Sequence, residues 1–153
     1  VLFRSGTPDE IYRRPQDPFV AGFVGDVNIL PGRYVSRDSA AILDLGGNVL
    51  RLPAERVHAS IGERLDVFVR PENIQLAALG PHSLLSATVI AHVFQGDHVD
   101  VHLDVPALGS ATLFARQSGL HSLTRWPVGS LVGVNVDDEG VCAFSATEQD
   151  KRG

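Results

Sequence analysis

The sequence predicts an all-β fold made of two related β modules, with a short helical segment at its N-terminus. Most of the chain consists of short stretches in which apolar and polar residues alternate. Gly, Pro, Asn or Asp bounds these stretches, which is typical of strands joined by tight turns. No helical pattern of ten residues or more occurs after Phe23. A similar strand pattern follows both Gly62 and Gly129, which indicates that one β module occurs twice.

The N-terminal helical segment begins with favourable capping chemistry. Thr7 can cap the helix, and Pro8 suits its first position. Glu10 stands three residues after Thr7 and completes a capping box. Pro15 and Pro18 end the segment, because the residue before a proline is disfavoured in helical geometry. We therefore expect one short helix before the β body.

The first strand is expected to begin at Asn28, after an apolar stretch at 19–24 that ends at Gly25. Gly25 suits a left-handed helix cap, because glycine adopts positive φ without strain. We expect Asn28 to bond backbone where the chain enters the first module, since Asn commonly serves turns and strand ends.

The remaining expected strands follow from alternation and turn chemistry. Gly46 and Gly47 join two of them in a tight hairpin, and a turn at 137–140 joins the last two in a closing hairpin. The expected strands are Ala41–Leu45, Asn48–Leu52, Arg64–Val69, 86–94, His98–Val105, Leu131–Val136 and 141–144.

The repeated pattern is a glycine followed by apolar residues three, five and seven positions later. These residues are Leu65, Val67 and Val69 after Gly62, and Val132, Val134 and Val136 after Gly129. A glycine before an alternating strand is common, but the shared offsets favour a duplicated module.

Composition limits the possible classes of function. The 153 residues include 44% hydrophobic residues, enough for the core of one domain or two small ones. The net charge is −5, Lys and Arg form no basic patch, and aromatic residues are scattered, so nucleic-acid binding is disfavoured. No run of eighteen apolar residues occurs, so we expect no direct membrane insertion. Cys142 stands among apolar residues, and we expect a small buried thiol there.

A polar stripe on the expected strand His98–Val105 is the one pattern that could carry chemistry. Its members share one face of the strand and are His98, Asp100, His102 and Asp104. Residues four apart on a strand are ~13 Å apart, so the two histidines cannot hold one metal ion. A site would need Asp100, one histidine and partners from elsewhere. A half-exposed strand facing water explains the same alternation, and we predict no metal site.

Two blocks of the sequence follow a specific order of residues. The first, at 6–32, is Gly-Thr-Pro, an acidic residue, Ile-Tyr, Pro, then Phe-Val-Ala, Phe, Gly, Asn and Gly. This order resembles the segment between the nucleotide-binding domain and the C-terminal regulatory (TOBE) domain in ATP-binding subunits of bacterial ABC importers, of the polyamine, ferric-iron and maltose type. The matching residues are Gly6, Thr7, Pro8, Glu10, Ile11, Tyr12, Pro15, Pro18, Phe19, Val20, Ala21, Phe23, Gly25, Asn28 and Gly32, and in the second block Val69, Arg70, Pro71 and Glu72.

The resemblance covers residue 6 onward and implies a domain layout. It implies an OB-like β-barrel regulatory domain at 28–147, with modules at approximately 28–79 and 84–147. Residues 1–27 would be a linker and helical remnant of an ATPase domain absent from this sequence, and 148–153 a tail. Residues 1–5 depart from the family pattern, and we interpret them as an assembly scar.

The resemblance also indicates Asn28, Arg70 and Glu72 as candidate contacts between domains or between two copies of the subunit. Arg70 and Glu72 lie on the same side of a strand end, and Pro71 between them fixes the exit direction. In the functional interpretation, the planar guanidinium faces a carboxylate or carbonyls of another domain. The alternative is a local ion pair at the strand end, worth under ~1 kcal/mol if exposed.

By the resemblance, this sequence is the regulatory and dimerisation domain of a subunit that couples ATP hydrolysis to solute uptake. Hydrolysis needs a Gly-rich loop with a lysine, and no such loop precedes the only lysine, Lys151. We therefore expect no enzyme activity, catalytic residue or cofactor in this sequence; ATP and Mg²⁺ would bind in the ATPase domain. The implied partners are a second copy of the subunit, its own ATPase domain and permease subunits, at the cytoplasmic face of the plasma membrane.

A free-standing small-ligand module is the alternative, because TOBE-type domains elsewhere bind oxyanions such as molybdate. Backbone amides and hydroxyl groups would have to converge on a pocket between the modules, and Ser83, Ser86 and Thr88 are the candidates. Micromolar binding of molybdate, tungstate or sulfate in calorimetry would favour this alternative.

Overall fold

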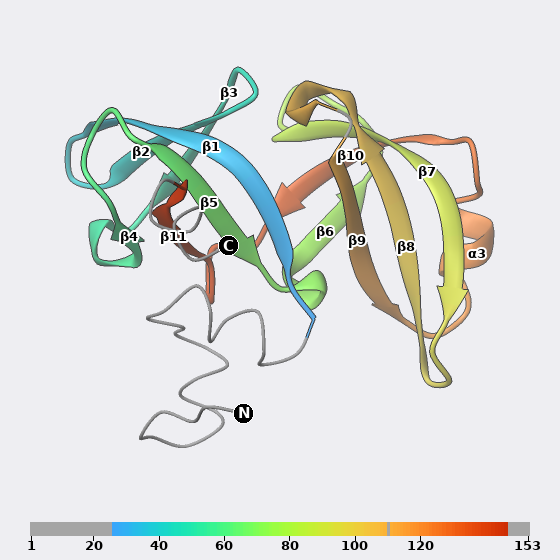
Figure 1. Ribbon diagram of the computed structural model, residues 1–153. Helices are drawn as coiled ribbons and strands as arrows, with labels where there is room; N and C mark the ends of the chain where they lie inside the picture. The colour runs from blue at the N-terminus through green and yellow to red at the C-terminus, as the bar shows by residue number, and fades with distance from the viewer. Residues whose placement is uncertain (1–25, 110, 147–153) are drawn as a thin grey trace, which may run out of the picture.

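The computed structural model describes residues 26–109 and 111–146 and contains two β-sheets side by side (Figure 1). The first sheet has the strand order β3-β2-β1-β5-β11-β4 and the second β6-β10-β7-β8-β9. The strands are β1 (Asn28–Arg37), β2 (Ala41–Leu45), β3 (Asn48–Leu52), β4 (Val57–His58), β5 (Arg64–Val69), β6 (Ile74–Ala77), β7 (Leu85–Phe94), β8 (His98–Val105), β9 (Ala111–Ser118), β10 (Leu131–Val136) and β11 (Cys142–Ser145).

The helical elements in the described segments between the strands are all short. These are η1 (Ala54–Arg56), η2 (Pro71–Asn73), η3 (Pro106–Leu108) and α3 (Ser122–Arg125). The prediction of an all-β fold is confirmed. The expected N-terminal helix, Gly25 and the tail at 148–153 lie outside the described residues.

Local turn chemistry explains the strands that the sequence predicts correctly. The β2–β3 hairpin has the predicted bounds, and Gly46 and Gly47 at its turn have φ values of 61° and 90°. A type I′ turn requires positive φ at both central residues, which glycine adopts without strain. β5, β8 and β10 also have the predicted bounds, and the strand predicted at 86–94 begins slightly earlier, at Leu85.

The predicted closing hairpin between 131–136 and 141–144 is wrong. β10 pairs with β6 and β7 in the second sheet, whereas β11 pairs with β4 and β5 in the first. The turn at 137–140 therefore carries the chain from one sheet to the other, and on the way the Asp137 N–H bonds the Asn73 carbonyl at 2.9 Å. Both strands are apolar and mostly buried, so local composition does not select between a hairpin and a crossover.

The two sheets repeat one pattern of strands and hydrogen bonds. The order β3-β2-β1-β5-β11 in the first sheet corresponds to β9-β8-β7-β10-β6 in the second. The Gly62 N–H bonds the Tyr34 carbonyl at 2.7 Å, and the Gly129 N–H bonds the Val89 carbonyl at 2.7 Å. A β-bulge follows both Tyr34 and Val89. The two related β modules expected from the sequence are confirmed.

Each module supplies its last strand to the sheet of the other module. β6 follows β5 along the chain but pairs with β10, and β11 follows β10 but pairs with β5. Backbone hydrogen bonds of both modules therefore complete each sheet, and neither sheet consists of one contiguous stretch of chain.

The sequence did not predict β9, β6 or β4. In β9 the fully buried residues are Leu113 and Ala115, and its last residues, Arg116, Gln117 and Ser118, are polar. β6 has four residues and β4 has two, which is too short for alternation to identify a strand.

One hydrophobic cluster spans both sheets, with alternate strand positions such as Leu43, Val67 and Val101 fully buried. A smaller cluster contains Phe68, Cys142 and Phe144. Cys142 is 4% exposed, so the predicted buried thiol is confirmed. Within the described residues, the structure contains no helix with the length and apolar composition to span a membrane.

Candidate functional site

The three candidate contact residues lie where β1 begins and β5 ends. Asn28 is the first residue of β1, and Arg70 stands between β5 and η2. Asn28 is 3% exposed and Arg70 4%, whereas Glu72 in η2 is exposed. Arg70 Nη1 donates to the Asp26 carbonyl at 3.2 Å. The contact between domains or copies that we expect of these residues stays a prediction, and Glu72 is its exposed member.

The carboxamide of Asn28 bridges the two sheets. Its Nδ2 donates to the Phe114 carbonyl and its Oδ1 accepts from the Phe114 N–H, both at 2.9 Å. Phe114 lies on β9, the edge strand of the second sheet, where backbone groups lack a strand partner on one side. The expected bond from Asn28 to backbone is confirmed, and its partner lies 86 residues away in the sequence.

Asn28→Ala is expected to lower the free energy of unfolding by about 2 kcal/mol, because a backbone donor and a backbone acceptor both lose their partner. Urea denaturation measures the loss. Asn48→Ala is the matched control, since Asn48 Nδ2 bonds the Leu45 and Gly46 carbonyls at 3.2 and 3.3 Å within one turn. The control should cost less than ~1 kcal/mol. Equal losses would contradict a bridging role for Asn28.

Arg116 joins two carboxylates beside the same junction. Its Nε and Nη2 donate to the two oxygens of Asp100 at 2.9 and 3.1 Å, and Nη2 also donates to Asp26 Oδ2 at 2.9 Å. The Asp100 side chain is 5% exposed and that of Arg116 25%. Hydrogen bonding to Asp100 raises the pKa of Arg116 further above its usual value, so the guanidinium remains charged. The arrangement is a bidentate ion pair with one buried member.

The polar stripe of β8 is therefore not a face turned wholly to water, because Asp100 is buried against Arg116. His98 Nδ1 lies 2.7 Å from the carboxylate of Asp97, and His102 stacks on Phe114. Across residues 26–109 and 111–146, no group of three or more His, Cys, Asp and Glu residues could hold a metal ion.

Arg116 is the residue at this junction that sequence reasoning missed. A carboxylate that is buried on a strand needs a cation nearby. The position of Asp100 on its strand could therefore have indicated that a basic residue lies opposite. Its partner could not be located, because the sequence did not predict β9, on which Arg116 lies opposite Asp100.

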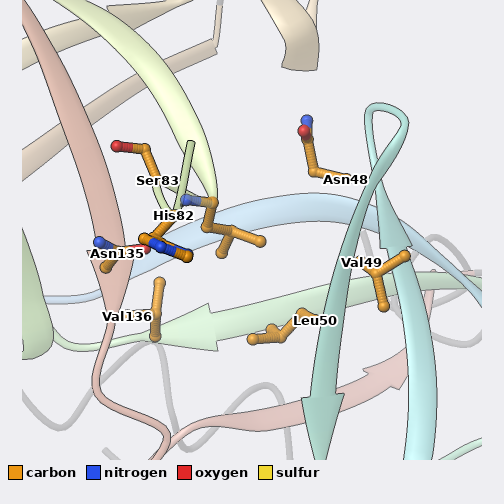
Figure 2. Close-up of a pocket in the computed structure, with 8 residues that line it drawn as sticks. Asn48, Val49, Leu50, His82, Ser83, Asn135 and Val136 are labelled. Carbon is orange, nitrogen blue, oxygen red and sulfur yellow. Dashed lines mark hydrogen bonds between the residues drawn. The ribbon is translucent and has the colours of Figure 1, made fainter. Parts of the chain in front are cut away.

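A cleft of about 320 Å³ opens between the β2–β3 hairpin and the segment before β7 (Figure 2). Val49 and Leu50 of β3 form one wall, and His82, Ser83 and Asn135 belong to the other. This is an interface between the two sheets, because β3 is in the first and β10, which carries Asn135, is in the second.

A more open cleft of about 480 Å³ lies beside η1. Its lining includes Arg37 and Arg51 together with Glu55 and Asp138. Because charges of both signs line this cleft, it favours neither an anion nor a cation.

The three hydroxyl residues considered for oxyanion binding do not converge on one pocket. Ser83 lines the inter-sheet cleft, but its Oγ accepts a hydrogen bond from the Gly80 N–H at 3.2 Å. Ser86 and Thr88 lie further along β7, paired with β10. The Ser83 hydroxyl also lies against Gly133, so closely that a Cβ there would collide with it.

Known proteins are similar to this chain in sequence, and one solved structure is similar in fold. The TOBE domain family model matches residues 67–144. The chain is similar to the spermidine/putrescine import ATP-binding protein PotA of Borreliella afzelii, with 33% identity over 105 residues, covering 69% of this chain and 28% of the relative. It is also similar to the Fe(3+) ions import ATP-binding protein FbpC of Rhizobium etli, with 28% identity over 147 residues, covering 95% of this chain and 39% of the relative.

The chain thus spans 28% and 39% of the length of these two relatives. Among solved structures, the cytoplasmic molybdate-binding protein ModG, crystallised with molybdate bound, superposes with a TM-score of 0.58 and 14% identity. That match covers 76% of this chain and 94% of the ModG chain, and it shows a common fold.

Proposed function

The chain belongs to the TOBE domain family, and on that premise we propose that it is the regulatory and dimerisation domain of the ATP-binding subunit of an ABC importer. In this proposal the whole subunit hydrolyses ATP to drive uptake of a solute of the polyamine, ferric-iron or sugar class. ATP and Mg²⁺ bind in its ATPase domain, and this chain is not itself an enzyme. The subunit docks on permeases at the cytoplasmic face of the plasma membrane.

The observation that supports this proposal best is the alignment of nearly the whole chain with part of an import ATP-binding protein. The relatives are longer than this chain, as expected if another domain accompanies the β body. The order of residues at 6–32 also resembles the segment that joins an ATPase domain to its regulatory domain in such subunits.

A β body whose two sheets are joined by exchanged strands suits a contact between two subunits. The exchanged strands β6 and β11 connect the two modules. Hydrogen bonds from Asn28 and Arg116 stabilise the junction between the sheets. ATPase domains must approach and separate in each cycle. A contact between regulatory domains that persists in both states favours neither state, so it keeps the subunits together without opposing the motion.

Sedimentation of the 153-residue chain tests the dimerisation role. We expect a monomer–dimer equilibrium. Glu72→Arg should weaken it about fivefold, because reversing an exposed charge in an interface costs on the order of 1 kcal/mol. Glu55→Arg, an exposed position on η1, is the matched control and should leave the equilibrium unchanged. A chain that stays monomeric at every concentration, or equal effects of both substitutions, would contradict the dimerisation role.

The natural reading frame tests the assignment to an ATP-binding subunit separately. We expect it to encode a phosphate-binding loop, G-x-x-x-x-G-K-[ST], upstream of Thr7. A native start codon close to Thr7 would overturn the assignment, whatever the sedimentation experiment gives.

A further inference from the structure

The two modules form two equivalent junctions between the sheets. Leu30 of β1 and Leu85 of β7 occupy equivalent positions in the two modules, because they pair with corresponding residues of β5 and β10. Two residues earlier, Asn28 in the first module therefore corresponds to Ser83 in the second. Each junction faces the edge strand of the other sheet, β9 at Asn28 and β3 at Ser83.

The first junction is filled and the second is open. At the first, the Asn28 carboxamide both donates to and accepts from the Phe114 backbone at the edge of β9. At the second, the Ser83 hydroxyl is turned toward Gly133 and away from β3. The cleft of about 320 Å³ remains in the place that a longer side chain could occupy (Figure 2).

The edge strand β3 presents backbone groups to this junction much as β9 does to Asn28. A two-residue turn closes the β2–β3 hairpin on a hydrogen-bonded pair, so bonded and non-bonded pairs alternate along it. Val49 and Arg51 are then non-bonded positions, whose N–H and C=O point away from β2. The pairing register makes Arg51 the counterpart of Phe114. Val49 is the neighbouring non-bonded position on the same edge of β3, and it lines the cleft.

The opposite wall adds hydrogen-bond donors. Asn135 Oδ1 accepts from the Leu84 N–H at 2.9 Å, which fixes the carboxamide and leaves its NH₂ group to donate. His82 lines the same cleft, across from Leu50 (Figure 2). Among the described residues that line this cleft, none is Asp, Glu, Lys or Arg. The lining therefore combines uncharged polar side chains with apolar ones, which suits a neutral ligand that forms hydrogen bonds.

We propose that this cleft binds a small molecule that carries a primary carboxamide. Such a group donates and accepts at once, as Asn28 does at the first junction, and so it can satisfy both the N–H and the C=O of Val49. A carboxylate only accepts, and a cation finds no carboxylate in the lining. The apolar side chains of Leu50 and Val136 accommodate a ring or a short aliphatic body. The site goes beyond the assembly role proposed above and does not depend on it.

Titration of the 153-residue chain with nicotinamide, followed by amide NMR, tests the site. Nicotinic acid is the matched ligand, because it differs only in its carboxylate. We expect saturable shifts at Val49, Leu84 and the Asn135 side-chain NH₂, with a dissociation constant in the millimolar range that is usual for so small a ligand. Nicotinic acid should bind about tenfold more weakly, since it cannot donate to a backbone carbonyl.

Two substitutions locate the binding. Asn135→Asp keeps an acceptor for the Leu84 N–H but removes the NH₂ donor, and should weaken nicotinamide binding about tenfold. Val49→Trp, at a cleft residue that is 61% exposed, should fill the cleft and abolish binding. Gln117→Glu on β9 makes the same amide-to-acid change elsewhere and should leave binding unchanged. Absence of saturable shifts, equal binding of both ligands, or binding that survives Val49→Trp would each overturn the proposal.

Discussion

Arg116→Met is expected to lower the free energy of unfolding by about 3 kcal/mol or more, because it leaves the buried carboxylate of Asp100 without its cation. The Asp100 side chain is 5% exposed, so water cannot replace the two hydrogen bonds that Arg116 supplies. The same substitution also breaks the bond from Arg116 to Asp26, before the start of β1. Urea denaturation at neutral pH, followed by circular dichroism, measures the loss.

Two further chains separate this effect from the general loss of an arginine. Arg51→Met breaks a pair with Asp38 whose side chains are 54% and 58% exposed, and should cost less than ~1 kcal/mol. The double variant Asp100→Asn with Arg116→Met removes the buried charge as well, and should recover much of the lost stability. A loss for Arg116→Met no greater than that for Arg51→Met would show that the buried pair does not stabilise the junction.

Gly46→Ala is expected to cost about 2–4 kcal/mol, because the new Cβ has no room and the backbone has positive φ. Gly46 has φ of +61°, and a Cβ there would collide with the Ala107 carbonyl oxygen and lie 2.8 Å from its carbon. Those atoms are backbone of η3, so they cannot rotate out of the way. The hairpin tip of the first sheet would have to lift from the second sheet, and thermal unfolding should report the change.

Gly47→Ala is the matched control for that prediction. Gly47 stands next in the same turn with φ of +90°, and a Cβ there would meet nothing within 4 Å. Only the left-handed backbone should then oppose the substitution, at about 1 kcal/mol. If both substitutions destabilise the protein equally, the approach of the hairpin tip to η3 contributes little.

The elements that the sequence predicts correctly are those with local causes. The β2–β3 hairpin depends on two adjacent glycines, and β5, β8 and β10 depend on alternation within one stretch. The pairing of β11 with β5 is a contact between distant segments, and no local pattern distinguishes it from a hairpin with β10. The composition of β9 hides its strand character, because its last three residues are polar.

In the candidate site, too, the sequence predicts local roles but not the contacts between distant segments. Asn28 could be expected to bond backbone, but not to reach Phe114, because that contact exists only after the two sheets have packed. Arg116 could not be paired with Asp100 without knowing β9. The inter-sheet cleft combines 48–50, 82–84 and 135–136, three stretches that the fold alone brings together.

The exchange of β6 and β11 has a consequence for synthesis on the ribosome. The first sheet needs β11, which ends at Ser145, so it cannot be completed until almost the whole domain has emerged. β6 emerges much earlier and must wait for β10 to cover its edge. Such distant pairings slow folding and leave strand edges exposed in nascent chains. A chain released before Val136, where β10 ends, would therefore carry two incomplete sheets rather than one finished half, which makes it a natural target for chaperones and proteases.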